Sequence, residues 1–439
     1  MSRVRLPWAD DPAVSLIMPS YGMADMTIAA LAAIAANTSP IFETFVVDDA
    51  SPDGAADLIA TDVGGVDLLR SESNLGFGHA VNLAAVRSRG RYLCVMNNDI
   101  YPEPGWLEPM LARMTDPGVG AVVPMFRNPD GSVQEAGVAM GSDGFPWRWG
   151  GGLPPEAPEV AFPRTVDYGS GACMLVRTDS FREAGGFRAE YGLGYLEDSD
   201  LCMTLRTRGL RTVYEPKARV IHAVHGTFGA QSAHRLSEEN RPRFLGRWAH
   251  LLFDRPPLRY GDLHPAFTVR ARDALASHRV LLAAHHPGWI DLARELRHLL
   301  HDARLTALLF GDATTVDPSD LRSREVEVVP SSDPTRWLAQ RRGHPDLVWV
   351  FDSEAMAALG PALSATQRQA AWIHGITAVP SSSIMPQADG EAGHPPTVLV
   401  APPGHLESVG RRHPDARVLP ADTTVPRLLA EAGILTARP

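Results

Sequence analysis

Short apolar runs alternate with amphipathic stretches through the first half of the chain. A continuous apolar run bounded by turn residues is typical of a strand buried on both faces of a parallel sheet. Such strands are predicted at Val14–Pro19, Phe42–Val47, Val66–Leu69, Tyr92–Met96 and Val119–Pro124. The stretches between them have helical periodicity at Met26–Ala36, Ala55–Ile59, Ala80–Ser88 and Gly105–Met114. This alternation predicts an α/β fold with a doubly wound, mainly parallel sheet.

The pattern is less regular from residue 128 to residue 252. Asn128–Gly152, with several glycines and tryptophans, predicts a hairpin or a flexible flap. Further elements are predicted as strands at Tyr168–Val176, Arg211–Tyr214 and Arg219–Ile221 and as helices at Ser180–Ala184 and Leu201–Arg208. Helices through about Leu252 are expected to pack back over this sheet.

Three prolines, Pro256, Pro257 and Pro265, mark a linker after the first sheet. We therefore predict a first domain at residues 1–253, a linker at 254–278 and a smaller Rossmann-like α/β domain at 279–439. The predicted strands of this second domain are Arg279–Ala283, Leu305–Phe310, Val326–Val329, Leu347–Phe351, Ala371–Ile373, Thr397–Ala401 and Arg417–Leu419. Ser381–Pro396 is predicted to be an exposed loop.

Length and composition fit an ordinary globular protein of about two domains, with 439 residues, 44% hydrophobic and 21% charged. The net charge of −10 argues against nucleic-acid binding and against tight adhesion to an anionic membrane. The three cysteines, Cys94, Cys173 and Cys202, form no Cys-x-x-Cys pair, so no disulfide framework or zinc site is implied. No signal peptide or membrane-spanning run is present, so we expect a cytoplasmic protein with at most peripheral membrane contact.

Candidate chemistry begins where the buried strand Tyr92–Met96 stops, at Asn97, Asn98 and Asp99. Open α/β sheets bind their ligands at the carboxyl ends of the strands, where Asp99 is expected to lie. A carboxylate there suits Mg²⁺ or Mn²⁺, and such an ion suits a diphosphate. Alternatively, Asp99 only caps a turn.

Two more polar loops follow strands of the same predicted sheet. At Asp48-Asp49, one carboxylate can accept an N–H from a nucleobase while the other holds the loop; a helix N-cap is the plainer interpretation. In the loop Asn74–Asn82, Gly76 and Gly78 leave room for close backbone contact with a diphosphate or a sugar.

Three carboxylates gather at the start of a predicted helix, in Glu197-Asp198-x-Asp200. One or two acids there are explained by the helix dipole, but three repel one another. A carboxylate in this position could act as a general base toward an acceptor hydroxyl. Gly192 and Gly194 just before would let this loop move or let a substrate pack closely.

His222 ends another predicted strand and is a candidate ligand for the metal ion at Asp99, or a phosphate partner. A lone histidine at a strand end is more often structural. His225 adds little, because no further His or Cys completes a zinc-like set.

Taken in order, these motifs resemble the family 2 inverting glycosyltransferases, above all the rhamnosyltransferase-like members with the GT-A fold and its Rossmann-like mixed sheet. The resemblance covers about Ala13 to Trp248. It depends on the set Asp48-Asp49, Asn74-x-Gly76-Phe77-Gly78, Asn97-Asn98-Asp99, Gly185-Gly186-Phe187, Glu197-Asp198-x-Asp200 and His222.

The resemblance implies roles for individual residues. Donor binding would fall to Ser20, Tyr21, Asp49 (on the nucleobase), Asn74, Gly76, Phe77, Asn82, Asn97 and Asn98. Asp99 would bind the metal of the family's Asp-x-Asp motif, whose first acid is replaced here by Asn97, and His222 would complete the metal and diphosphate shell. Asp198 would be the catalytic base, supported by Glu197 and Asp200.

The implied activity is transfer of a sugar from a UDP, dTDP or GDP donor to a hydroxyl acceptor (a glycan, a lipid-linked acceptor or a natural product), in a metal-dependent single displacement with inversion. Mn²⁺ or Mg²⁺ would be the cofactor. The alternative is a non-catalytic nucleotide-sugar-binding scaffold whose C-terminal domain recruits a partner. A nucleotidyltransferase is disfavoured because Pro19–Met23 lacks a Gly-rich, basic loop. We expect an accessory role for residues 279–439 in acceptor binding or dimerisation, and the sequence does not decide whether a homodimer forms.

Overall fold

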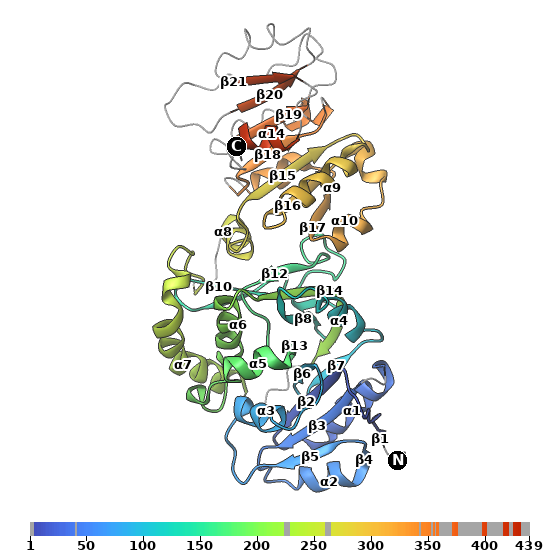
Figure 1. Cartoon of the computed structure of the whole chain (residues 1–439), viewed down its shortest axis with the longest axis vertical. Helices are drawn as coiled ribbons and strands as arrows, with labels where there is room; N and C mark the ends of the chain where they lie inside the picture. The colour runs from blue at the N-terminus through green and yellow to red at the C-terminus, as the bar shows by residue number, and fades with distance from the viewer. Residues whose placement is uncertain are drawn as a thin grey trace. The chain divides into compact units, whose positions relative to one another are not determined.

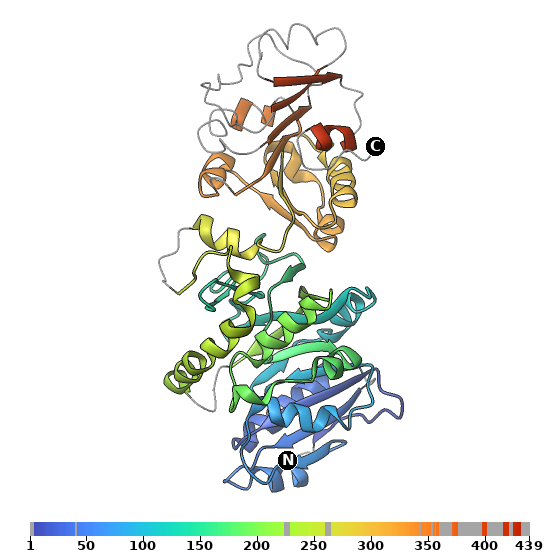
Figure 2. The same cartoon turned by 60° about the vertical axis from the view of Figure 1, so that its left-hand side comes forward.

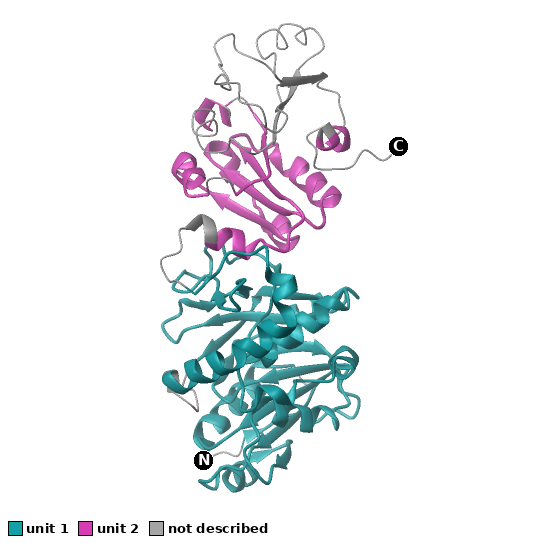
Figure 3. Ribbon diagram, turned by 90° about the vertical axis from the view of Figure 1, so that its left-hand side faces the viewer, with its two compact units in different colours: residues 1–261 teal, residues 262–439 magenta. Residues whose placement is uncertain are grey.

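The computed structural model describes residues 4–39, 42–223, 229–259, 265–341, 344–352, 354–355, 357–359, 371–375, 397–401, 416–420 and 425–431. Contacts divide the chain into two compact units, Met1–Gly261 and Asp262–Pro439 (Figure 3). Each unit is built around its own sheet. The predicted exposed loop Ser381–Pro396 lies outside the described residues.

One half of the first unit's main sheet is parallel, as the apolar runs predict. Its strands are β2 (Val14–Ser20), β3 (Phe42–Asp48), β5 (Asp67–Arg70) and β6 (Tyr92–Met96). β2 lies between β3 and β6, and β5 pairs with β3 at the edge (Figure 1). All residues of β3 and β6 are buried, which explains why β6 is continuously apolar; β3 also buries Glu43, whose carboxylate accepts hydrogen bonds from Ser15 and Arg89.

The other half makes the sheet mixed, so the mainly parallel arrangement predicted from the alternation holds for one half only. β13 (Cys173–Arg177) runs antiparallel to both of its neighbours, β6 and β8 (Val119–Arg127). β14 (Arg211–His222) is parallel to β8 and antiparallel to β12 (Arg164–Val166). An antiparallel strand needs no helical crossover, so the irregular segment before β13 can return the chain directly.

Short strands complete this half of the unit. β7 (Ile100–Pro102) pairs with the end of β14, and β9 (Val133–Glu135) pairs with β8. β10 (Val138–Met140) and β11 (Pro146–Arg148) form the antiparallel hairpin that the glycine-rich stretch predicts. β1 (Val4–Arg5) and β4 (Val63–Gly64) form a separate parallel pair.

The structure differs from the predicted strands most clearly at β13 and β14. The strand expected at Tyr168–Val176 begins only at Cys173, because the preceding glycines put residues 168–172 into an irregular path. The two strands expected at Arg211–Tyr214 and Arg219–Ile221 are one strand, β14, whose register shifts between Glu215 and Arg219. Pro216 cannot donate to a ladder, and a bulge accommodates it.

Helices cover the sheet on two faces. They are α1 (Ala24–Asn37), α2 (Ala55–Asp62), α3 (Phe77–Ala85), α4 (Leu107–Arg113), α5 (Thr178–Ala184), the 3₁₀ turn η1 (Ala189–Tyr191), α6 (Glu197–Thr207) and α7 (Gly229–Leu252). One core cluster joins Leu16 of β2 and Cys94 of β6 to Leu31 of α1 and Met110 of α4. α3 packs against β2 and β3, and α5 packs against α6 and β13.

The second unit holds a seven-stranded, all-parallel sheet in the order β17-β16-β15-β18-β19-β20-β21. Its strands are β15 (Arg279–Ala284), β16 (Arg304–Leu309), β17 (Val326–Pro330), β18 (Leu347–Val350), β19 (Ala371–Gly375), β20 (Thr397–Ala401) and β21 (Ala416–Pro420). In chain order this is 3-2-1-4-5-6-7, the doubly wound arrangement extended by one strand. The alternation seen in the sequence beyond the linker therefore forms a Rossmann-like sheet.

The helical elements of the second unit with described bounds are α8 (Pro265–Arg272), α9 (Trp289–Leu299), η2 (Gly311–Thr315), α10 (Ser319–Ser323), α11 (Pro334–Ala339) and α14 (Val425–Glu431). α8 lies within the stretch predicted as a linker. Among the described residues, no helix combines the length and the apolar character needed to cross a bilayer.

Candidate active site

Asp99 and His222 lie together at the carboxyl edge of the first sheet. After β6 the backbone N–H of Asn97 donates to the carbonyl of Ala172, and the chain turns into β7. Ile100 of β7 pairs with His222 at the end of β14, which brings the histidine beside Asp99. Oδ2 of Asp99, a residue only 4% exposed, lies 3.4 Å from Nε2 of His222. The two side chains predicted to bind metal are thus neighbours.

These two side chains fit a divalent cation. A carboxylate oxygen and an imidazole nitrogen are ligands that Mn²⁺ accepts, and ligand bonds of about 2.1 Å leave neighbouring ligand atoms roughly 3.0–3.5 Å apart. Within the described part of the chain, no cluster of three or more His, Cys, Asp or Glu side chains surrounds such a site. The protein would therefore supply two ligands, and water or a substrate phosphate would supply the rest, as is common for Mg²⁺.

Asp198 is held in place by backbone amides. The N–H of Gly171 donates to its Oδ2 at 2.9 Å, and the N–H of Ser199 donates to its Oδ1 at 2.6 Å. Gly171 comes just before Ala172, the residue bonded to Asn97, so Asp198 lies at the same edge of the sheet as Asp99. Residues 171 and 172 thus connect the predicted base to the turn that carries the predicted metal ligand: Gly171 bonds to Asp198, and Ala172 bonds to Asn97.

Burial changes the acid chemistry at the start of α6. Burial, and then the adjacent Asp198, raise the pKa of Glu197 to about 8. Burial also raises the pKa of Asp198, although the amides of Gly171 and Ser199 partly offset it. Among the described residues, no hydrogen-bond donor reaches Oε2 of Glu197. Both carboxyl groups therefore have a pKa above that of an exposed acid, and the pKa of about 8 leaves Glu197 protonated near neutral pH.

The turn that leads into Glu197 is strained. Tyr195 and Leu196 have φ of 74° and 75°, a conformation that costs side-chain-bearing residues about 1 kcal/mol or more each. Asn240 of α7 stabilises this turn, because its Nδ2 donates to the carbonyls of Tyr191, Gly194 and Tyr195.

Asp200, the third acid of the motif, bonds to residues of α7, the helix that lies beside α6 (Figures 1 and 2). Its Oδ1 accepts hydrogen bonds from Arg247, Trp248 and Tyr191. Asp200 therefore anchors α7 to α6. The resemblance implies that Asp200 supports Asp198; in the structure, any such support is indirect, because Asp200 fixes the position of α6, the helix that carries Asp198.

Asp49 shapes the loop that follows α2 and β5. Its carboxylate accepts the N–H of Leu75 at 3.1 Å and that of Gly76 at 2.8 Å. Gly76 has φ of 94°, and a Cβ there would lie 2.5 Å from Cα of Leu193. Phe77 donates its N–H to the carbonyl of Leu193. The predicted donor loop is thus packed against the segment that leads to Asp198.

The other predicted donor-binding side chains fall into two groups. Ser20, Asn98 and Asn82 are engaged inside the fold: Ser20 and Asn98 both bond to Oγ1 of Thr27, and Asn82 pairs with both backbone groups of Phe187. Tyr21, Asn74, Phe77 and Asn97 are half-buried. The role of each in binding a donor stays a prediction.

Sequence reasoning missed two residues of β9, Gln134 and Glu135. Oε1 of Gln134 lies 2.7 Å from Nδ1 of His222. Oε1 of Glu135 accepts the N–H of Ser170, the amide next to the one that holds Asp198, so the two carboxylates lie side by side. Burial raises the pKa of Glu135, and the charge of Asp198 adds to the rise. The available signal was two adjacent polar residues between apolar ones in the predicted flap, which does not reveal their partners.

Arg148 of β11 brings a positive charge to the same cluster. Its Nε lies 3.4 Å from Oε2 of Glu135, and its side chain is 65% exposed. The site thus holds three neighbouring carboxyl groups at one sheet edge, beside the Asp99–His222 pair. Such an arrangement can accept a proton from a substrate hydroxyl while a cation offsets charge on a leaving group.

Comparisons with known proteins identify the family of this chain. Residues 15–185 match the model of the family described as glycosyl transferase family 2. The chain is 30% identical over 278 residues to the N-acetylglucosaminyl-diphospho-decaprenol L-rhamnosyltransferase of Mycobacterium tuberculosis, covering 56% of this chain and 86% of the relative. It is 42% identical over 60 residues to rhamnosyltransferase WbbL of Escherichia coli, covering 14% and 22% of the two chains.

One similar solved structure is that of mannosyltransferase PcManGT from Pyrobaculum calidifontis in complex with GDP-Man and Mn²⁺. The likeness has a TM-score of 0.40 and 20% identity and covers 58% of this chain and 68% of that one. With the mycobacterial relative matched over most of its length, the GT-A fold and the rhamnosyltransferase-like character predicted from the motifs are confirmed. The chain belongs to glycosyl transferase family 2.

Proposed function

We propose that this glycosyltransferase moves a sugar from a nucleoside diphosphate donor to a hydroxyl acceptor by a single displacement with inversion. The observation that carries the proposal is the position of Asp198, which the amide of Gly171 holds at the same sheet edge as the Asp99–His222 pair. A base and a leaving-group site at one edge are what a direct displacement requires.

Asp198 acts as the base in this proposal. Its carboxylate accepts the proton of the acceptor hydroxyl while that oxygen attacks the anomeric carbon from the face opposite the diphosphate. The new carbon–oxygen bond forms as the bond to the diphosphate breaks, and the electron pair leaves with the diphosphate. The raised pKa of Asp198 makes its carboxylate a stronger base, because a general base works best when its pKa is close to the operating pH.

Asp99 and His222 would hold the divalent cation, Mn²⁺ or Mg²⁺. When bound, the ion would offset the charge that builds on the departing nucleoside diphosphate. Asn97, in place of a second acid, is half-buried at the same turn and can hydrogen-bond to ribose or to the sugar.

On the donor side, Asp49 would act chiefly by fixing the loop through Leu75 and Gly76. Its neighbour Asp48 has an Oδ1 that no hydrogen bond reaches within the described residues, so either carboxylate of the pair could take the nucleobase N–H. Tyr21 and Asn74 would line the rest of the nucleotide site.

The names of the relatives suggest which substrates to try. The mycobacterial relative is an L-rhamnosyltransferase named for a diphospho-decaprenol acceptor, so we favour a rhamnosyl donor and a lipid-linked glycan acceptor. Residues 279–439 would have an accessory role, in acceptor binding or in dimerisation.

The test is a transfer assay with UDP-, dTDP- and GDP-sugars, with and without EDTA. We expect one donor to support transfer, EDTA to stop it and Mn²⁺ or Mg²⁺ to restore it. Nuclear magnetic resonance of the product should show the anomeric configuration opposite to that of the donor. Donor binding without turnover across the whole panel would instead favour a nucleotide-sugar-binding scaffold, and a retained configuration would exclude the single displacement.

A further inference from the structure

Gln134 occupies a bulge in β9, next to the candidate metal site. Phe126 of β8 pairs with Glu135 and Arg127 pairs with Val133, so Gln134 is the extra residue on the bulged strand. Bulges are frequent beside active sites, where they redirect a side chain. Here the bulge lets two consecutive side chains serve the same site, Gln134 at His222 and Glu135 beside Asp198.

The orientation of the Gln134 amide follows from its partners. Nε2 of Gln134 donates to the carbonyl of His222 at 3.2 Å and to Oδ1 of Asn128 at 3.0 Å. A carbonyl only accepts, so the nitrogen must face it. The Asn128 amide is set in the same way, because its Nδ2 lies against the carbonyl of Val133 and the hydroxyl of Ser132.

This orientation determines the tautomer of His222. With its nitrogen committed to carbonyl oxygens, Gln134 presents Oε1 to Nδ1 of the imidazole at 2.7 Å, and Nδ1 must carry a hydrogen. In the neutral ring, Nε2 then has the lone pair, and Nε2 is the atom that faces Oδ2 of Asp99. The ring of Phe126, with its centroid 5.9 Å from that of His222, packs beside the imidazole.

We propose that Gln134 is a positioning residue that presets His222 as an Nε2 ligand for the divalent cation. The inference rests on the metal site of the proposed function. Metal-binding histidines commonly donate their second nitrogen to an oxygen, and loss of that partner typically weakens metal binding 10- to 100-fold. The lone pair on Nε2 of His222 and the carboxylate of Asp99 repel each other at 3.4 Å, and a cation bound to both would replace that repulsion with attraction.

The test compares two substitutions by direct titration of the purified full chain with Mn²⁺ alone. Gln134→Leu removes the acceptor oxygen, and we expect Mn²⁺ to bind 10- to 100-fold more weakly. Gln134→Glu keeps an oxygen for Nδ1–H but loses the donor to the His222 carbonyl and to Asn128. If the oxygen is what matters, Gln134→Glu binds Mn²⁺ at least as tightly as the wild type.

Other outcomes overturn the inference. Gln134→Leu with wild-type affinity would show that the tautomer is set elsewhere. Equal weakening in both variants would assign Gln134 to holding the loop, because that role needs the amide nitrogen. A His222→Ala variant separates this inference from the proposed function. If His222→Ala binds Mn²⁺ with wild-type affinity, the proposed metal site is wrong. If His222→Ala binds Mn²⁺ more weakly but Gln134→Leu does not, only the role of Gln134 is wrong. Thermal melting of each variant checks that it is folded.

Discussion

Two clusters of buried charge, one in each unit of the chain, differ in how their charges are balanced. In the first unit, burial raises the pKa of Glu135, Glu197 and Asp198, and the Arg148 side chain that pairs with Glu135 is largely exposed. In the second unit, Asp273 and Glu327 meet the buried guanidinium groups of Arg272 and Arg304.

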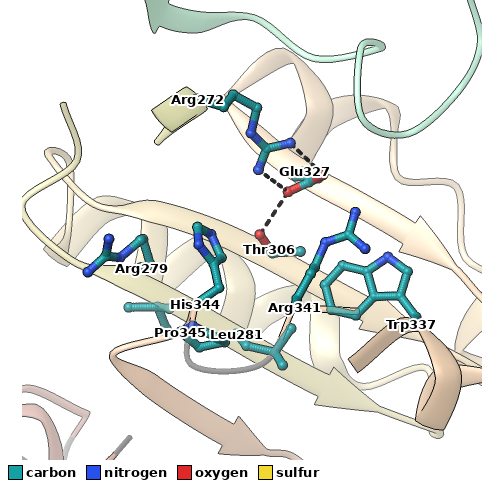
Figure 4. Close-up of a pocket in the computed structure, with 10 residues that line it drawn as sticks. Arg272, Arg279, Leu281, Thr306, Glu327, Trp337, Arg341, His344 and Pro345 are labelled. Carbon is teal, nitrogen blue, oxygen red and sulfur yellow. Dashed lines mark hydrogen bonds and ion pairs between the residues drawn. The ribbon is translucent and has the colours of Figure 1, made fainter. Parts of the chain in front are cut away.

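The second cluster is satisfied within itself. Figure 4 shows Arg272 bonded to Glu327, which also accepts the hydroxyl of Thr306. Burial alone would raise the pKa of Asp273, but Arg272 and Arg304 outweigh it and hold that pKa well below its usual range. Arg272 likewise holds the pKa of Glu327 low against the effect of burial.

The shallow pocket at this second cluster is lined by Arg279, Trp337, Arg341 and His344 among others (Figure 4). It lies at the amino ends of the parallel strands, since Arg279 begins β15 and His344 precedes β18. Open α/β sheets bind ligands at the opposite edge. Balanced charges at the amino edge therefore indicate packing, whereas unbalanced acids at a carboxyl edge indicate chemistry.

The largest expected effect comes from the unbalanced cluster. Asp198→Asn keeps the shape of the side chain but removes the base, so we expect kcat to fall about 10²- to 10⁴-fold. The substitution removes an unfavourable buried charge but also one of the two oxygens that accept the amides of Gly171 and Ser199, so we expect little change in the melting temperature, and the donor should still raise it. Transfer kinetics and thermal shift measure the two properties. Asp179→Asn, at an exposed position, is the control, and full transfer by Asp198→Asn would exclude this residue as the base.

In the balanced cluster the effect should fall on stability. Arg272→Met leaves Glu327 and Asp273 with less compensation, and breaking a buried ion pair costs about 3–5 kcal/mol. Urea unfolding should show this loss. The double variant Arg272→Met/Glu327→Leu removes the uncompensated acid as well and should recover a large part of the stability. Equal stability of Arg272→Met and the wild type would mean that the network is not what holds α8 to the sheet.

A smaller effect concerns the pH dependence of stability. The pKa of Glu197 in the folded chain, about 8, is above its ordinary value of 4.5, so the folded chain binds this proton more tightly than the unfolded chain does. The wild type therefore loses stability as pH rises from about 5 to 8. Glu197→Gln lacks this loss, and its advantage over the wild type should grow across that range by at least about 1 kcal/mol, the equivalent of one pKa unit. Urea melts at several pH values measure it, with Glu183→Gln as the exposed control; parallel curves would contradict the raised pKa.

Much of this site could be predicted from local sequence. Apolar runs that stop at polar residues predicted the ends of β6 and β14. Because parallel strands place their carboxyl ends at one edge of a sheet, the sequence also predicted that Asp99 and His222 would lie close together. The roles of Asp49 and Asp200 were harder to predict from the sequence. Whether a carboxylate faces a substrate or holds its own fold depends on partners distant in sequence, such as Gly76 for Asp49 and Trp248 for Asp200.

The contribution of two β9 residues to the site could not be predicted either, for a different reason. Gln134 and Glu135 reach the site because a bulge shifts the register of β9 against β8, and a register shift of one residue changes which face a side chain takes. The antiparallel direction of β13 is a similar case, because a buried apolar strand has the same composition in either direction.

The single amide of Asn240, which bridges three carbonyl groups of the strained turn, has a practical consequence for anyone who shortens this protein. The family match ends at residue 185, ahead of both Asp198 and the helix that carries Asn240. A fragment cut at that limit would lose Asp198, the proposed base. One cut after α6 would keep Asp198 but lose the Asn240 hydrogen bonds that stabilise the turn before it. The shortest useful fragment therefore extends at least through Leu252, where α7 ends.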